Sequence, residues 1–205
     1  MRRLPPRRNI TLMLAGVVGM GISLSLLLKV GYGTDTSSFM NASIASRIGI
    51  SLGTVMVSMN AIQLIAEIIW GRRFIGIGTI VNMAVIGYIS DLCTMLEERY
   101  LPEWIFTLQP YRTATFAVAL AFFLISAALY MNSDTGLAPY DAIPTIISAN
   151  VHIPFFAVRM AWDFLAIAIG IAAGGHLTIG TVILALTIGP TVAWIGSLMR
   201  RMQSI

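Results

Sequence analysis

The sequence predicts an all-α membrane protein with six transmembrane helices. Of its 205 residues, 57% are hydrophobic and only 11% are charged, and its mean hydropathy is +0.84. Ordinary soluble domains carry about 25% charged residues, so no part of this chain resembles a soluble domain. Apolar runs of about 17 to 25 residues recur along the chain, which is the length that crosses a bilayer core. We therefore expect one integral membrane domain over residues 1–205.

Six apolar runs are the expected spans. They cover about residues 11–28, 49–70, 74–96, 113–131, 154–173 and 177–199. The first follows a basic start, as a signal peptide would, but it lacks a convincing small-residue cleavage site, so we expect it to be retained as a span.

Arginine pairs mark the ends of several spans. They lie at residues 2–3, 7–8, 72–73 and 200–201, and they hold eight of the thirteen basic residues. Basic residues gather on the cytoplasmic side of membrane proteins, where anionic lipid attracts them. Six spans would place all four pairs on that side, with both termini in the cytoplasm. The net charge of +4 thus indicates anchoring at a lipid bilayer rather than nucleic-acid binding.

Two polar breaks divide the chain into similar halves. Residues 31–38 and 136–144 each follow an apolar run. Each leads into a segment, at about 37–48 and 143–149, that is too short to cross the membrane. Such a segment is either a re-entrant half-helix or a helix at the interface. We expect repeat one over about 11–96, an aqueous connection over about 97–112 and repeat two over about 113–199.

Matching residues support this repeat. Ile77-Gly78-Thr79 aligns with Ile179-Gly180-Thr181, Gly87 with Gly189, and Gly31 with Gly136. Each half holds an odd number of spans, three, so the two must enter the membrane from opposite sides. The expected architecture is an inverted repeat, with a broken or re-entrant segment after the first helix of each half.

The same breaks carry a resemblance to a known family. At residues 136–142, at Gly33-Thr34-Asp35 and at 78–91, the chain resembles the YitT/YczE/YyaS group of bacterial integral membrane proteins. The resemblance covers nearly the whole chain and implies a multi-pass protein of the bacterial inner (plasma) membrane with a transporter-like role. It supplies no agreed substrate. Thr36 and Ser37 stand where members of that group often place a proline and an aromatic residue.

Asp163 is the clearest candidate for a functional residue. Counted from Pro154 at 1.5 Å per residue, it lies about 13 Å along its helix, near the bilayer midplane. An ionisable group at that depth costs about 2.5 to 3.5 kcal/mol on insertion scales, so it needs a partner, water or a function. Arg159 lies four residues earlier on the same helical face and can pair with it. A structural ion pair and a substrate or proton site both fit this pattern.

Other polar residues are candidates for the same site. Asn60 falls opposite Asp163 by the repeat offset, and with Gln63 and Asn82 it could line a polar cavity or form interhelical hydrogen bonds. Glu67, near Arg72 and Arg73, is expected to form a surface ion pair rather than to bind a coupling ion.

The starts of the two short helices carry carboxylates. Asp35 and Asp141 lie there, with Tyr140 beside Asp141. A carboxylate at such a position can cap free backbone N–H groups. If the segments re-enter the membrane, their free backbone groups would instead bind a small polar solute or ion, as broken helices do in carriers.

The pattern favours a membrane transporter of a small polar solute or ion, with its site between the repeats near Asn60, Asp141, Arg159 and Asp163. Enzyme motifs are missing from the sequence, and Cys93 and two separated histidines offer no metal-ligand spacing. We therefore expect no enzyme, metal or cofactor. The alternatives are a substrate-capture subunit that works with a separate ATPase, and an accessory or regulatory membrane protein. A second copy of the chain is a further possible partner.

Overall fold

The computed structural model describes residues 6–50 and 52–203, and in this part of the chain the secondary structure is helical, with no strand. The elements are α1 (Arg7–Val30), α2 (Thr36–Ile48), α3 (Leu52–Trp70), the 3-10 helix η1 (Arg72–Phe74), α4 (Ile77–Tyr100), α5 (Trp104–Thr107), α6 (Tyr111–Met131), α7 (Pro139–Val151), α8 (Phe155–Ala172) and α9 (Ile179–Gln203). The all-α prediction is confirmed for the described residues.

Five of these helices are long and apolar enough to cross a membrane: α1, α4, α6, α8 and α9. The remaining expected span, at about residues 49–70, corresponds to α3, whose apolar stretch Thr54–Trp70 falls below that length. Its 17 residues extend about 26 Å at 1.5 Å per residue, slightly less than a typical hydrocarbon core. The lengths and compositions indicate a membrane protein. The arginine pair at residues 2–3 lies outside the described residues, while Arg72 and Arg73 are exposed as anchoring residues would be.

The chain folds into two compact units, and each unit draws on both halves of the sequence. Unit 1 comprises residues 1–31, 76–138 and 191–205, and unit 2 comprises residues 32–75 and 139–190. The first helices of the two halves, α1 and α6, therefore share unit 1, whereas both short helices lie in unit 2 with the helices that follow them.

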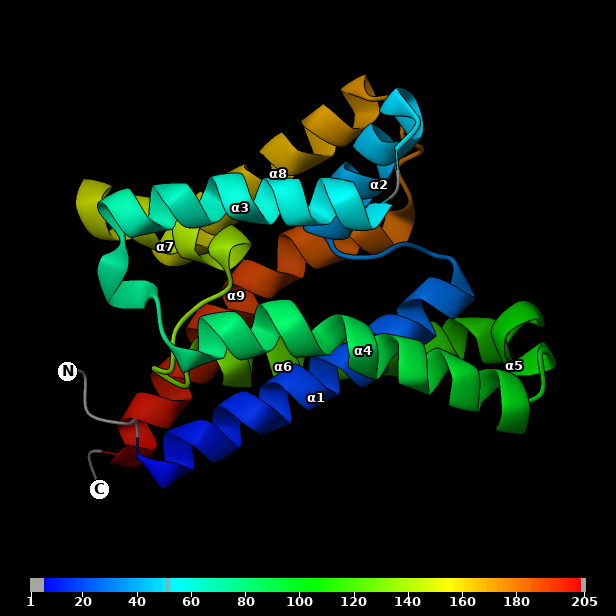
Figure 1. The fold of residues 1–205 in the computed structure, drawn as a ribbon. Coiled ribbons are helices and arrows are strands. Elements are labelled where there is room, and N and C mark those ends of the chain that lie inside the picture. The colour runs from blue at the N-terminus through cyan, green and yellow to red at the C-terminus, as the bar shows by residue number, and fades with distance from the viewer. Residues whose placement is uncertain (1–5, 51, 204–205) are drawn as a thin grey trace. The chain divides into compact units, whose positions relative to one another are not determined.

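Unit 1 is built around α1, which packs against both α6 and α4 (Figure 1). Met13, Val17 and Tyr130 form its buried apolar cluster. At the far end of α4, the hydroxyl of Ser25 donates a 2.7 Å hydrogen bond to Oε1 of Glu97, and Glu97 is only 7% exposed. At the start of the expected aqueous connection, α4 continues to Tyr100 and Glu97 is packed inside the unit.

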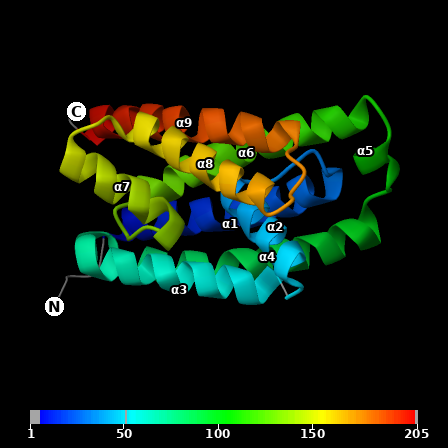
Figure 2. The ribbon, with the colours of Figure 1, turned by 90° about the horizontal axis from the view of Figure 1, so that it is seen from above.

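Unit 2 contains two pairs of a short and a longer helix. The short helix α2 packs against α8 and α3, and the short helix α7 packs against α3 and α8 (Figure 2). On α3 the large apolar side chains Ile62, Ile65 and Ile69 are exposed, whereas Gln63 and Glu67 are buried. This arrangement is the reverse of a soluble helix, and it is what a helix in lipid needs, since polar groups there must face protein.

The two polar breaks dock onto helix starts through matching contacts. In unit 2 the carbonyl of Tyr32 accepts a 2.9 Å bond from the backbone N–H of Gly180, and in unit 1 the carbonyl of Thr135 accepts a 2.8 Å bond from Gly78. Each break therefore satisfies a free N–H at the start of the last long helix of the opposite half of the sequence.

A glycine makes each of these docked turns possible. Gly33 and Gly136 have φ values of +128° and +112°, which L side chains rarely adopt. A Cβ on Gly33 would lie 2.7 Å from the backbone nitrogen of Thr181, and one on Gly136 would lie 2.8 Å from Oγ1 of Thr79. Gly33 and Gly136 thus have the same role in the two docked turns, whereas the sequence alignment paired Gly136 with Gly31.

Candidate functional site

A buried polar cluster in unit 2 centres on Asp163, which is fully buried in α8. Its Oδ1 accepts hydrogen bonds from Oγ1 of Thr36, at 2.5 Å, and from the hydroxyl of Tyr140, at 2.9 Å. Its Oδ2 accepts a 2.9 Å bond from Nε of Arg159. The Thr36 and Tyr140 hydroxyls are themselves 2.9 Å apart. Three donors from three helices therefore meet on one carboxylate.

Arg159 joins this carboxylate to a second one. Its Nη1 forms an ion pair with Oδ1 of Asp141 while its Nε bonds Asp163, and only 3% of the arginine is exposed. The guanidinium also lies 5.2 Å from the centre of the Tyr140 ring, within cation–π range. The fork of an arginine suits two acceptors at once, so Arg159 fixes the positions of both carboxylates.

The starts of both short helices converge on the cluster. Thr36 is the first residue of α2, and Tyr140 and Asp141 lie in the first turn of α7. Asp35 caps α2, since its Oδ2 accepts a 3.0 Å bond from the N–H of Ser38. The positive end of each helix dipole thus lies near carboxylates, which helps to hold negative charge inside the protein.

The cluster carries more negative than positive charge. Asp141 and Asp163 supply two carboxylates, and Arg159 supplies one guanidinium, so the ionised group has a net charge of −1. Such a cluster can attract a cation, or it can exchange one of its internal partners for the donor group of a polar solute. Because these charges are buried away from water, either exchange would change their interaction energies strongly, and with them the packing of the helices that carry them.

A pocket of about 190 Å³ adjoins the cluster. Its lining includes Tyr140, whose hydroxyl holds Asp163, together with Gln63, Met59 and Trp162. The Tyr140 and Trp162 rings lie 5.9 Å apart, and the indole nitrogen of Trp162 is buried without a hydrogen-bond partner. A ligand in this pocket would meet an aromatic and otherwise apolar surface beside the charged cluster.

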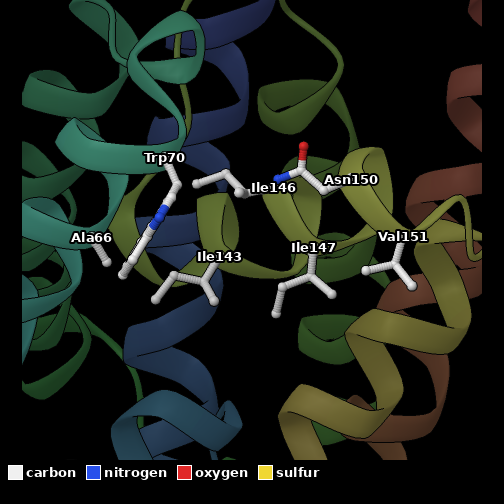
Figure 3. Close-up of a pocket in the computed structure, with 7 residues that line it drawn as sticks. All are labelled: Ala66, Trp70, Ile143, Ile146, Ile147, Asn150 and Val151. Atoms are coloured by element: carbon white, nitrogen blue, oxygen red, sulfur yellow. The ribbon is translucent and has the colours of Figure 1, made fainter.

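A second pocket, of about 310 Å³, lies between α3 and α7. Figure 3 shows Trp70 and Ala66 of α3 on one side, with Ile143, Ile146 and Ile147 of α7 among the residues on the other. Asn150 is the polar side chain of its lining. This pocket suits an apolar group, such as part of a lipid, better than a polar solute.

The structure brings together four of the seven predicted site residues. Asp141, Arg159, Asp163 and Tyr140 form the cluster described above, and the predicted pairing of Arg159 with Asp163 is confirmed. Asp35 caps α2 one residue before Thr36, so its predicted capping is confirmed as well.

The other two predicted residues are Asn82 and Asn60. Asn82 belongs to unit 1, where its Nδ2 is buried without a hydrogen-bond partner. Asn60 is half-buried in unit 2, and among the hydrogen bonds of the described residues none joins it to the cluster. Asn60 and Asp163 lie on different helices, and the repeat offset does not specify how those helices are rotated against each other.

Two buried residues were not recognised as parts of the unit 2 interior. Thr36 was noted only as a departure from a family pattern, yet it donates to Asp163. Glu67 was expected in a surface ion pair, but it is fully buried and neither carboxylate oxygen has a hydrogen-bond partner, so that prediction is wrong. The signal for Glu67 was its position one helical turn after Gln63, which places both on one polar face of α3.

These features define a multi-helix membrane protein with a buried, charged side-chain cluster. The chain belongs to the family described as "Family of unknown function (DUF6198)", whose model matches residues 7–197. It is also similar to a protein of Haemophilus influenzae that carries the name "Uncharacterized protein". The two are 22% identical over 200 residues, which cover 97% of this chain and 88% of the relative. No solved structure matches the chain.

Proposed function

We propose that the protein moves a small polar solute or ion across a bacterial plasma membrane, with its site at the Asp141–Arg159–Asp163 cluster. The observation that carries the proposal is this cluster itself, because charges buried among apolar helices are costly and in membrane proteins they mark substrate and ion pathways. The short helices α2 and α7 direct their starts at it, as the broken helices of carriers do at their binding sites.

The pairing of elements within each unit supports an inverted repeat. In unit 2 the short helix of each half packs on the long helix of the other half, α2 on α8 and α7 on α3. The breaks before these short helices use the same kind of backbone bond, from Gly180 to Tyr32 and from Gly78 to Thr135. Six crossings, with α3 as a short one, would place both termini in the cytoplasm. The resemblance to the YitT/YczE/YyaS group agrees with a transporter-like membrane protein.

A ligand screen tests the function directly. Thermal unfolding of the detergent-purified protein is measured with amino acids, vitamins, nucleobases, anions and metal ions. A ligand present at a hundredfold excess over its Kd stabilises the folded state by about 2.7 kcal/mol. We expect a stabilising solute for the wild type, a lost shift in Asp163→Asn and Tyr140→Phe, and a normal shift in the control Asp134→Asn, whose side chain is exposed in unit 1.

The outcomes separate the possible roles. Uptake of the stabilising solute by vesicles that contain the chain alone would support transport, whereas binding without uptake and co-purification of an ATPase would favour a substrate-capture subunit. A shift that persists unchanged in Asp163→Asn and Tyr140→Phe would contradict the proposed site.

Topology has its own test. Ser46 and Ala149 are exposed near the ends of α2 and α7, at corresponding positions of the two halves. In a Cys93→Ser background, cysteines introduced there are expected to react with an impermeant maleimide from opposite sides of the membrane. Labelling of both from one side would contradict the inverted repeat.

A further inference from the structure

Glu67 is a second acidic feature of unit 2, with no hydrogen bond to the cluster around Asp163. It lies in α3, none of its surface is exposed, and neither of its carboxylate oxygens accepts or donates a hydrogen bond. Buried carboxylates in proteins are normally paired or hydrogen-bonded, because an ionised one without a partner loses its hydration and gains nothing in return. This side chain therefore needs a ligand that compensates its charge.

The charged groups on the elements around α3 do not provide that compensation. From α7, Asp141 repels a negative charge at Glu67, and it is already paired with Arg159. On α2 the charged side chain is Arg47, which is exposed. In η1, Arg72 and Arg73 are exposed, and Nε of Arg72 donates to the carbonyl of Ile68. The balance of charge at Glu67 is negative.

The geometry favours a proton over a metal ion. Hard cations such as Ca²⁺ and Mg²⁺ need about six or more oxygen ligands, several of them from protein or water. Within residues 6–50 and 52–203 no group of three His, Cys, Asp or Glu side chains could hold a metal. A proton needs only one carboxyl group. It also removes the charge that makes burial costly.

Glu67 is close enough to the end of its helix for exchange with water. Its backbone carbonyl accepts a 2.8 Å bond from Gly71, which directly precedes the exposed residues Arg72 and Arg73. One helical turn separates Glu67 from Gly71, at the edge of that exposed segment. In the other direction, Gln63 lies one turn away in the lining of the pocket beside Tyr140.

We propose that Glu67 is a proton-binding site, which holds one proton near neutral pH and exchanges it with water at the η1 end of α3. The use of this proton as the coupling ion rests on the proposed transport function, whereas its presence on Glu67 does not. A carrier that exchanges a solute for a proton would then keep its two sites in one unit, at Glu67 and at the Asp163 cluster.

Infrared spectroscopy of the full chain in phosphatidylcholine and phosphatidylglycerol vesicles tests the site. The carbonyl stretch of protonated carboxyl groups is followed from about pH 5 to pH 9 in wild type, Glu67→Gln and the exposed control Glu98→Gln. We expect the wild type at pH 7 to show one carboxyl equivalent that is lost in Glu67→Gln and kept in Glu98→Gln. Equal signals in wild type and Glu67→Gln would overturn the proposal.

A second measurement guards against misfolding of Glu67→Gln. In wild type grown with carboxyl-labelled ¹³C-glutamate, the protonated signal must shift in frequency, and it must persist in Glu97→Gln, the other buried glutamate. A signal that does not shift, or that disappears in Glu97→Gln, would also overturn the proposal. A Glu67 signal without any stabilising solute in the ligand screen would contradict transport and still support the proton site. A stabilising solute without the Glu67 signal would support transport and contradict the proton site.

Discussion

Replacing Arg159 by methionine should destabilise the protein by several kcal/mol. The side chain is 3% exposed and donates to two carboxylates, at Nε to Asp163 and at Nη1 to Asp141. Hydrogen bonds to charged groups contribute about 1.5 to 3 kcal/mol each, so two of them amount to about 3 to 6 kcal/mol. Removing one partner of a buried pair costs about 3 to 5 kcal/mol, since it leaves uncompensated charge. We expect a loss of about 4 kcal/mol.

The assay is equilibrium unfolding of the detergent-solubilised chain by sodium dodecyl sulfate, followed by circular dichroism. The matched control is Arg47→Met on the exposed end of α2, where surface substitutions change stability by about 0.5 kcal/mol or less. The double variant Arg159→Met/Asp163→Asn should be less destabilised than the sum of its single variants, by about 1 to 3 kcal/mol. An Arg159→Met loss below about 1 kcal/mol, or strict additivity, would refute a buried, dry cluster.

Three further substitutions are tested by the same unfolding assay. Gly136→Ala should destabilise the protein by more than the backbone strain of about 1 to 3 kcal/mol, because the added methyl also clashes with the start of α4. Gly49→Ala meets open space and should destabilise it less. Equal losses of stability would contradict the close approach of Gly136 to α4. Asp35→Ala should lose about 1 kcal/mol with its helix cap, and Asp35→Asn should lose much less. Ser25→Ala leaves Oε1 of Glu97 without its donor and should cost about 1 to 3 kcal/mol; no change would mean that water replaces the hydroxyl.

Features that depend on one helix were predictable from the sequence. Arg159 and Asp163 are four residues apart, so helix geometry alone places them on one face, and the structure joins them at 2.9 Å. The apolar runs located the long helices to within a few residues, because the length of a run follows directly from the thickness of lipid. Asp35 was recognisable as a helix cap for the same local reason.

Features that depend on how helices are rotated against each other were not predictable. Thr36 reaches Asp163 only because α2 packs on α8, and the two residues are 127 positions apart in the sequence. The repeat offset relates equivalent residues, but it does not say which of them face one another. Asn60 shows this limit, since it matches Asp163 by offset and still has no hydrogen bond to the cluster among the described residues.

Glu67 was misplaced for a different reason, although its position relative to Gln63 on the same helix indicates the buried face. Nearness in sequence to Arg72 and Arg73 suggested an ion pair, but α3 ends at Trp70, so those arginines lie beyond the helix, in η1, where both are exposed. Gln63, at four residues, lies on nearly the same line and is also buried. In a helix whose exposed side chains are apolar, two polar residues on one line predict the protein-facing side. Helical phase therefore carries more information than sequence proximity for a charge in an apolar segment, and it places Glu67 on the face that packs inside unit 2.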